Sequence, residues 1–163
     1  GDNYHPKNSH VLPALIRRFH EAKVNDENEV IVWGSGMPKR EFLYVEDMAE
    51  ACLFVHDLDI SVYQNNTYTM LSHINIGTGI DVTIRKLAKT IKDVVAFEGH
   101  ISFDVSKPDG TPQKLMNVDL LKNLGWTANV SLEEGVKLSY LDFKNNFQDL
   151  RGQDNVKDIC NDW

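Results

Sequence analysis

Residues 32–48, with the sequence VWGSGMPKREFLYVEDM, carry groups that could bind a planar, anionic ligand. Trp33 offers an indole face that can stack on a flat ring. The glycines of Gly34-Ser35-Gly36 permit positive φ angles and a close approach of the backbone to a ligand. Arg40 follows, and a guanidinium can bind phosphate through two parallel hydrogen bonds. A plain strand, turn and strand with a surface arginine explains the same residues equally well, so this stretch alone leaves both interpretations open.

The elements expected around this stretch would bring the indole and the guanidinium within reach of one another. Short apolar runs predict strands over residues 29–33 and 41–45, one on each side of the glycine turn. Glu46 and Asp47 are typical of the first turn of a helix, where carboxylates suit the positive end of the helix dipole.

A helix expected upstream places further candidates near its N-terminal end. Apolar residues at helical spacing predict this helix over residues 12–22, after Ser9. Arg17 and Arg18 are expected on its flanks, and His10 where it begins. A histidine at the start of a helix is more often a packing or capping residue than a catalyst, so the pattern alone assigns no role to His10.

The remainder of the chain predicts an alternation of helices and short strands. Ser106 to Lys114 contains two prolines and a Pro-Asp-Gly turn signal, which is typical of a surface loop. The Gly77-Thr78-Gly79 stretch predicts a turn and nothing more, because a phosphate-binding loop needs a longer glycine pattern. The other expected elements are a helix over 46–58, a polar connection over 57–69, a strand over 71–76, a helix over 84–95 capped by Thr83, a strand over 101–105, a helix that is capped by Asp119 and ends at Gly125, and a last helix capped by Ser131 with a buried stripe of Leu132, Val136, Tyr140, Phe143 and Phe147.

Composition bounds the class of protein. The 163 residues suffice for one domain with a core, and the apolar share of 42% and charged share of 25% are ordinary for a globular protein. A net charge of -7 argues against nucleic acid and against an anionic membrane surface as partners. Cys52 and Cys160 lack metal-ligand spacing, so no metal site is expected. The cysteine usage and the absence of a signal peptide or long apolar run predict a cytoplasmic setting.

Four segments resemble a known family of enzymes: DNYHPKNSHVLPALIRRFHEA, VWGSGMPKREFLYVEDMAEA, MLSHINIGTG and SKPDGTPQKL. The pattern from Gly-Ser-Gly through Arg-Glu-Phe to Val-x-Asp-Met-Ala is similar to extended short-chain dehydrogenases/reductases that act on nucleotide sugars. Within that family, the segments resemble the NADP-dependent 3,5-epimerase/4-reductases that convert GDP-4-keto-6-deoxy-mannose to GDP-L-fucose. The resemblance covers residues 1–151.

The resemblance implies an α/β fold: the C-terminal, substrate-binding portion of such an enzyme, with small mixed sheets and about four to five helices. The glycine-rich cofactor motif and the Tyr-x-x-x-Lys set are missing, so the N-terminal Rossmann part is expected to be absent. Residues 1–151 would form the sugar-nucleotide-binding portion, with 46–78 packing on the missing Rossmann domain, and 152–163 a polar tail. A homodimer is expected, and this portion alone is expected to be inactive.

The resemblance also implies roles for individual residues. His10, in Asn8-Ser9-His10, would be the acid of the epimerisation and would lie near the nicotinamide of NADP, which the missing domain would mostly bind. The substrate, GDP-4-keto-6-deoxy-mannose, would contact Arg18 and Arg40 at its diphosphate and Trp33 at its nucleoside. Asp109 would touch the same ligand.

One segment departs from the family, and two alternatives remain open. The family usually has Lys-Leu-Leu-Asp where this chain has Lys114-Leu115-Met116-Asn117, so the role of that carboxylate is in doubt. One alternative is another nucleotide-sugar epimerase or dehydratase, with a different base or sugar. The other is a non-catalytic nucleotide-binding or assembly module.

Overall fold

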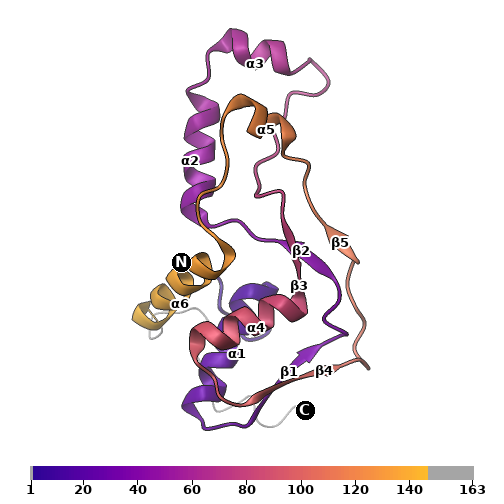
Figure 1. Cartoon of the computed structure of the whole chain (residues 1–163), viewed down its shortest axis with the longest axis vertical. Coiled ribbons are helices and arrows are strands. Elements are labelled where there is room, and N and C mark those ends of the chain that lie inside the picture. Colours follow the sequence, from indigo (N-terminus) through magenta and orange to yellow (C-terminus); the bar gives the residue numbers. More distant parts are fainter. Residues whose placement is uncertain (1, 147–163) are drawn as a thin grey trace.

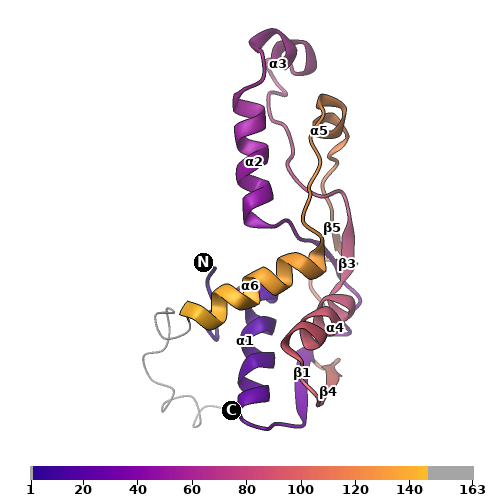
Figure 2. The same cartoon turned by 60° about the vertical axis from the view of Figure 1, so that its left-hand side comes forward.

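A computed structural model describes residues 2–146, which form an elongated body with a protruding arm (Figure 1). The body contains α1, α4, α6, β1 and β4, and the arm contains α2, α3 and α5 (Figures 1 and 2). The described residues form six helices and five short strands, which is more helices than the expected four to five. The elements are α1 Val11–Val24, β1 Glu29–Trp33, β2 Lys39–Glu41, α2 Val45–His56, α3 Ile60–Asn66, β3 Asp81–Thr83, α4 Ile84–Val95, β4 His100–Asp104, β5 Gln113–Lys114, α5 Asp119–Leu124 and α6 Leu132–Asn146.

The strands form two small sheets. In one, β1 and β4 pair in parallel, with Val32 opposite Phe103. In the other, β2 is the central strand, antiparallel to β3 and parallel to β5. The expected α/β class with small mixed sheets is therefore confirmed, and β2 brings together segments that are far apart in the sequence.

The main core lies where α1, α4 and α6 pack around β1. Phe19, Leu87, Ile91 and Phe143 are completely buried in it. The predicted helix over 84–95 and its cap are confirmed, since the Thr83 hydroxyl accepts a hydrogen bond from the Lys86 backbone N–H at 3.1 Å. The predicted Ser131 cap is also confirmed, by a bond of 3.2 Å from the Glu134 N–H. Of the expected stripe on α6, Val136, Tyr140 and Phe143 are buried, Leu132 is half-buried, and Phe147 lies outside the described residues, as does the expected tail over 152–163.

The arm has a smaller core of its own. Ala51 of α2 packs with Leu121 of α5 and with Trp126, and all three are buried. Other apolar side chains of the arm are exposed, including Met48 at 39%, Leu53 at 63% and Met70 at 94%. None of the helices in residues 2–146 is long and apolar enough to cross a membrane.

Several expected elements differ from those observed, and hydrogen bonding explains the differences. The strand expected over 41–45 is β2, which pairs with its neighbours only over 39–41 before α2 begins at Val45. The strand expected over 71–76 is wrong: apart from a bridge between Tyr68 and Leu71, no described segment pairs with it.

The polar connection expected over 57–69 contains a helix, α3. Asp59 caps its start, because Oδ1 accepts a hydrogen bond of 2.7 Å from the Ser61 N–H. Asp119 does not cap α5; the Asn117 side-chain oxygen accepts from the Asp119 N–H at 2.9 Å.

Asp47 links the arm to the body. The carboxylate was expected only to suit the helix dipole, but it is 2% exposed and one oxygen accepts two backbone hydrogen bonds. The Asn129 N–H donates at 3.2 Å and the Val130 N–H at 2.9 Å, just before α6 begins. A buried acceptor of this kind holds the first turn of α2 against the segment that leads into α6.

Replacing Asp47 is therefore expected to destabilise the fold. Asp47→Ala leaves two backbone N–H groups without their acceptor, which typically costs about 1–3 kcal/mol of unfolding free energy. Urea unfolding followed by circular dichroism measures the change. Glu46→Ala is the matched control, because Glu46 is the neighbouring carboxylate and is exposed. Equal effects of the two substitutions contradict the role assigned to Asp47.

Candidate functional site

A pocket of about 260 Å³ lies between the N-terminal half of α1, the end of β1 and the loop that follows β4. Four of the five candidate residues line it: Arg18, Trp33, Arg40 and Asp109. They come from α1, β1, β2 and the loop over 105–112, hereafter the 105–112 loop. The pocket is completed by Val11, Ala14, Leu15, Val32, Gly36, Pro38, Ile84, Pro108 and Gly110. The fold therefore gathers candidates that are up to about 90 residues apart in the sequence.

The glycine turn and the 105–112 loop are joined through Asp109. The Ser35 N–H donates to Asp109 Oδ1 at 2.8 Å, and the Ser35 hydroxyl donates to Oδ2 at 2.6 Å. Gly34 and Gly36 have φ of 81° and 74°, a region that strongly favours glycine. A Cβ at Gly34 would overlap Asp109 Oδ1. The turn thus needs a glycine both for its backbone angle and for the carboxylate packed against it.

These bonds also keep Asp109 ionised. Hydrogen bonds from the Ser35 hydroxyl and N–H lower the pKa of the Asp109 carboxyl below its ordinary value. The side chain is exposed, so it remains accessible to a ligand with further donors. A carboxylate has about four acceptor positions, and Ser35 occupies two of them.

Arg40 and its strand hold the other end of the 105–112 loop. The Arg40 guanidinium donates from Nη1 to the Thr111 carbonyl at 2.7 Å and to the Lys39 carbonyl at 2.6 Å. The Lys39 N–H donates to the Pro112 carbonyl at 2.8 Å. One edge of the guanidinium is thus fixed, which orients the rest of the group, and Arg40 lines the pocket.

Trp33 presents its ring at the rim of the pocket. The side chain is 54% exposed, and the Lys107 ammonium lies 5.3 Å from the ring centroid. A cation at this distance is attracted to an aromatic face. The indole is therefore a half-exposed ring at the rim, with a positive charge over one of its faces.

The two arginines of α1 have different environments. Arg18 lines the pocket and is exposed as a whole residue, but surrounding protein atoms partly desolvate its guanidinium and lower its pKa, an effect that the Glu21 carboxylate opposes. It stays protonated near neutral pH because a guanidinium titrates far above that range. Arg17 was expected on a flank of the helix, like Arg18, but its side chain is buried, at 4% exposed. Its Nε donates to Glu21 at 2.7 Å and its Nη1 to the Tyr4 carbonyl at 3.0 Å.

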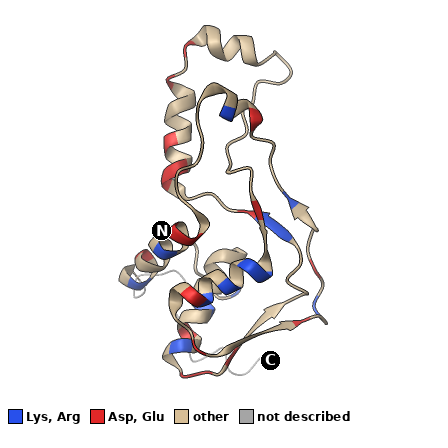
Figure 3. Cartoon of the chain, viewed as in Figure 1, with Lys and Arg blue, Asp and Glu red and all other residues tan. Residues whose placement is uncertain are grey.

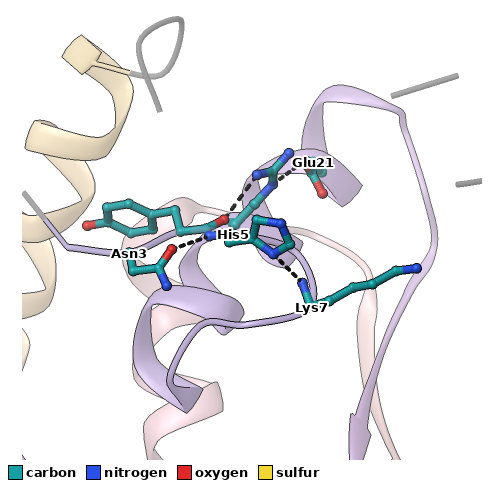
Figure 4. Close-up of polar contacts among 6 residues, drawn as sticks. Asn3, His5, Lys7 and Glu21 are labelled. Carbon is teal, nitrogen blue, oxygen red and sulfur yellow. Dashed lines mark hydrogen bonds and ion pairs between the residues drawn. The ribbon is translucent and has the colours of Figure 1, made fainter. Parts of the chain in front are cut away.

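The segment that precedes α1 is folded by its own side chains (Figure 4). The Asn3 side-chain oxygen accepts from the His5 N–H at 3.0 Å. The His5 ring Nδ1 accepts from the Lys7 N–H at 3.1 Å and from the Asn8 N–H at 3.2 Å. Tyr4 is buried against Phe143 of α6, with ring centroids 4.7 Å apart. The approach to His10 is therefore ordered by local hydrogen bonds and by the core.

His10 is the candidate that the structure does not place in the pocket lining. It directly precedes α1, and its carbonyl accepts the Ala14 N–H at 3.0 Å. Its side chain is exposed and makes no capping hydrogen bond. Because the next residue, Val11, lines the pocket, His10 lies at the edge of the site.

Two residues that the sequence analysis did not single out complete the site. Ser35 binds Asp109, and a serine between two glycines was the signal that could have identified it. Arg85, at the start of α4, donates from Nη2 to the Ser35 carbonyl at 2.9 Å and lies 3.8 Å from the Phe103 ring centroid. Nothing in the sequence indicates that α4 would reach the glycine turn.

The arrangement suits a ligand with a flat ring and negative charge. Lys and Arg positions on β2 and at the start of α4 lie close together in the fold, although the chain as a whole is acidic (Figure 3). Guanidinium groups in a partly enclosed site favour phosphate. Within residues 2–146, no three His, Cys, Asp or Glu side chains are grouped so that they could hold a metal ion. Cys52 is a free, exposed thiol of α2.

Comparison with known proteins identifies a matching family and several relatives of this chain. Residues 1–77 match the model of the NAD dependent epimerase/dehydratase family. GDP-L-fucose synthase of Escherichia coli K12 is 55% identical over 93% of this chain and 47% of its own length. GDP-L-fucose synthase 1 of Arabidopsis thaliana is 56% identical over 85% of this chain and 40% of its own length.

Solved structures agree with the sequence comparisons. The NADP-bound GDP-L-fucose synthetase of Naegleria fowleri is 29% identical, with a TM-score of 0.75 over 92% of this chain and 44% of that one. The chain spans about half the length of the curated relatives it matches. The resemblance seen in the sequence is thereby confirmed, and the chain belongs to the NAD dependent epimerase/dehydratase family of extended short-chain dehydrogenases/reductases, as a relative of the GDP-L-fucose synthases.

Proposed function

We propose that this chain is the substrate-binding part of an NADP-dependent 3,5-epimerase/4-reductase that converts GDP-4-keto-6-deoxy-mannose to GDP-L-fucose. The observation that carries the proposal is that Arg18, Trp33, Arg40 and Asp109 line one pocket. The identity to the GDP-L-fucose synthases supports the choice of substrate.

The contacts in the pocket suit the proposed ligand. Arg18 and Arg40 bind the diphosphate. The hydrogen bond from Arg40 Nη1 to the Thr111 carbonyl fixes the orientation of the guanidinium, and with it the directions of its other nitrogens. Trp33 stacks on the guanine. Asp109 accepts from sugar hydroxyls or from the guanine amino edge while it holds Ser35. Their contribution to the reaction is positioning, which holds the ketone near the groups that react.

His10 is proposed as the acid of the epimerisation. The 4-keto group acidifies the protons on the neighbouring carbons, and an imidazole at the edge of the pocket can return a proton to such a carbon. The His10 side chain is exposed and makes no capping hydrogen bond, so its ring is available for that proton transfer. NADPH supplies the hydride for the reduction when it is bound.

The cofactor is proposed to be held mostly outside this chain, with only His10 contributing here. Residues 1–151 are proposed as the sugar-nucleotide-binding portion, and 46–78 as the segment that packs on a Rossmann domain. The exposed Met48, Leu53 and Met70 of the arm support this division. Ala51, which lies in the same segment, already packs within the chain.

Titration calorimetry with GDP, UDP and dTDP tests the proposed ligand class. Preferential binding of GDP to this chain is the expected result. Equal binding of the three nucleotides favours another nucleotide-sugar enzyme, and binding of none of them removes the basis of the proposal.

Arg40→Ala is expected to weaken GDP binding by about 2–4 kcal/mol, because a desolvated charge pair loses one partner. The measurement is the dissociation constant by calorimetry. Lys39→Ala is the matched control, since it removes the same charge from the neighbouring position of β2 but does not line the pocket. An unchanged affinity in Arg40→Ala contradicts the assignment.

His10→Asn is expected to slow epimerisation by about 10²–10⁴-fold while leaving GDP binding nearly intact, because one acid–base group is lost. Deuterium exchange from solvent into the 4-keto sugar measures it, with this chain joined to the N-terminal portion of the E. coli relative. The control is His100→Asn, an exposed histidine at the start of β4. Normal exchange at both carbons in His10→Asn refutes the role.

The chain by itself is expected to self-associate and to oxidise no NADPH. Exposed apolar patches beyond a few hundred Å² favour association, and a homodimer through the arm would cover Met48 and Leu53. Sedimentation at increasing protein concentration tests the expected self-association, and an NADPH-oxidation assay tests the expected lack of turnover. Leu53→Lys should shift the chain toward monomer. A wild-type chain that stays monomeric at high concentration contradicts the packing argument, and measurable NADPH turnover contradicts the division of the enzyme.

A further inference from the structure

The Glu41 carboxylate joins three segments beside the pocket without lining it. Oε1 accepts from the Gly79 N–H at 2.7 Å and from the Thr78 hydroxyl at 3.3 Å. Oε2 accepts from the Met116 N–H at 3.1 Å. Glu41 itself belongs to β2, so one side chain connects this strand to the turn before β3 and to the segment after β5.

The turn is shaped to receive this carboxylate. A Cβ at Gly77 would overlap Glu41 Oε1 and lie 3.1 Å from the Met116 methyl carbon. The Gly77-Thr78-Gly79 stretch, which the sequence predicts as a plain turn, is thus a cradle for a side chain of the same protein. A second hollow, of about 410 Å³, lies next to it, and Glu41, Gly77 and Met116 are among the residues that line it.

Arg40 and Glu41 hold the two ends of one segment, residues 111–116. Successive side chains of a strand point to opposite faces, so Arg40 lines the pocket while Glu41 faces the other hollow. Arg40 and the Lys39 N–H hold Thr111 and Pro112, at the end of the 105–112 loop. Glu41 holds Met116, two residues beyond β5, which continues that loop.

The short strand β5 depends on these contacts. It pairs with β2 over only two positions, Gln113 opposite Lys39 and Lys114 opposite Arg40. Such a short ladder is weak unless it is fixed at its ends. With Pro112 held before it and Met116 held after it, the register is set, and so is the position of Asp109 and Gly110 over the pocket.

We propose that Glu41 is a positioning residue for the nucleotide pocket, which it shapes from outside by anchoring the chain beyond the 105–112 loop. This inference rests on the proposed function, since it concerns the same ligand. It assigns Glu41 no contact with substrate.

Two substitutions disturb the same contact from opposite sides. Glu41→Gln places an amide NH₂ opposite one of two backbone N–H donors that need an acceptor. The hydrogen bond from either Gly79 or Met116 is therefore lost. Gly77→Ala adds a methyl group that displaces the Glu41 carboxylate from the turn, while the side chain keeps its negative charge. Each is expected to raise the GDP dissociation constant about three- to tenfold, as for the loss of one or two hydrogen bonds.

The double variant distinguishes a shared contact from two separate defects. Glu41→Gln with Gly77→Ala should weaken binding about as much as either change alone, because residues that act through one contact are not additive. Glu98→Gln is the control: it removes the same charge at an exposed position between α4 and β4. Hydrogen exchange of residues 105–117 measures the positioning directly, and thermal unfolding detects a general loss of stability.

The outcomes separate this inference from the proposed function. Weaker GDP binding in both single variants, non-additivity in the double variant and faster exchange over 105–117 support it. Unchanged exchange over 105–117 in Glu41→Gln overturns it, as does additive weakening in the double variant. If the wild-type chain binds no GDP, the proposed function fails, and hydrogen exchange alone then decides whether Glu41 anchors the loop.

Discussion

The candidate site depends on the attachment of one loop to one short stretch of chain. Residues 35–41 hold residues 109–116 at successive points: Ser35 at Asp109, Arg40 at Thr111, the Lys39 N–H at Pro112 and Glu41 at Met116. Individually, such exposed or half-buried hydrogen bonds contribute little, roughly 0.5–1.5 kcal/mol each. Together they fix the loop along its length, so the pocket is closed on that side by hydrogen bonds rather than by apolar packing.

This attachment needs a rigid base, and the main core supplies it. Phe19, Leu87, Ile91 and Phe143 fill the space between α1, α4 and α6, and β1 and β4 lie against them. The core fixes the directions of α1 and β1, which bring Arg18 and Trp33 to the pocket. Arg85 extends the same base to the glycine turn. The arm has a thinner core around Ala51, Leu121 and Trp126, and Asp47 joins it to the body.

The site residues show what sequence motifs can predict about a binding site and what they cannot. Gly-Ser-Gly, Arg-Glu-Phe and Lys-Pro-Asp-Gly resemble motifs of nucleotide-sugar enzymes. Trp33, Arg40 and Asp109, which lie in or beside these motifs, line one pocket together with Arg18, whereas His10 lies at its edge. The motifs do not say what the residues bind within the chain. Asp109 was expected to face a ligand, and it also carries Ser35. Arg17 resembles Arg18 in the sequence, but it is buried and holds the Tyr4 carbonyl, because a helix places adjacent residues on different faces.

By itself, the sequence determined the elements whose signals are local: the helix over 84–95 with its Thr83 cap, and the Ser131 cap of the last helix. Apolar periodicity and capping need only neighbouring residues, so they survive in any context. Tertiary structure decided whether an extended segment became a strand. Residues 71–76 have the composition of a strand but pair only through the Tyr68–Leu71 bridge among the described residues, whereas Gln113 and Lys114 become β5 because β2 lies beside them. It also decided the roles of Glu41 and Asp47, since a carboxylate's partners come from segments that the chain brings together only when it folds.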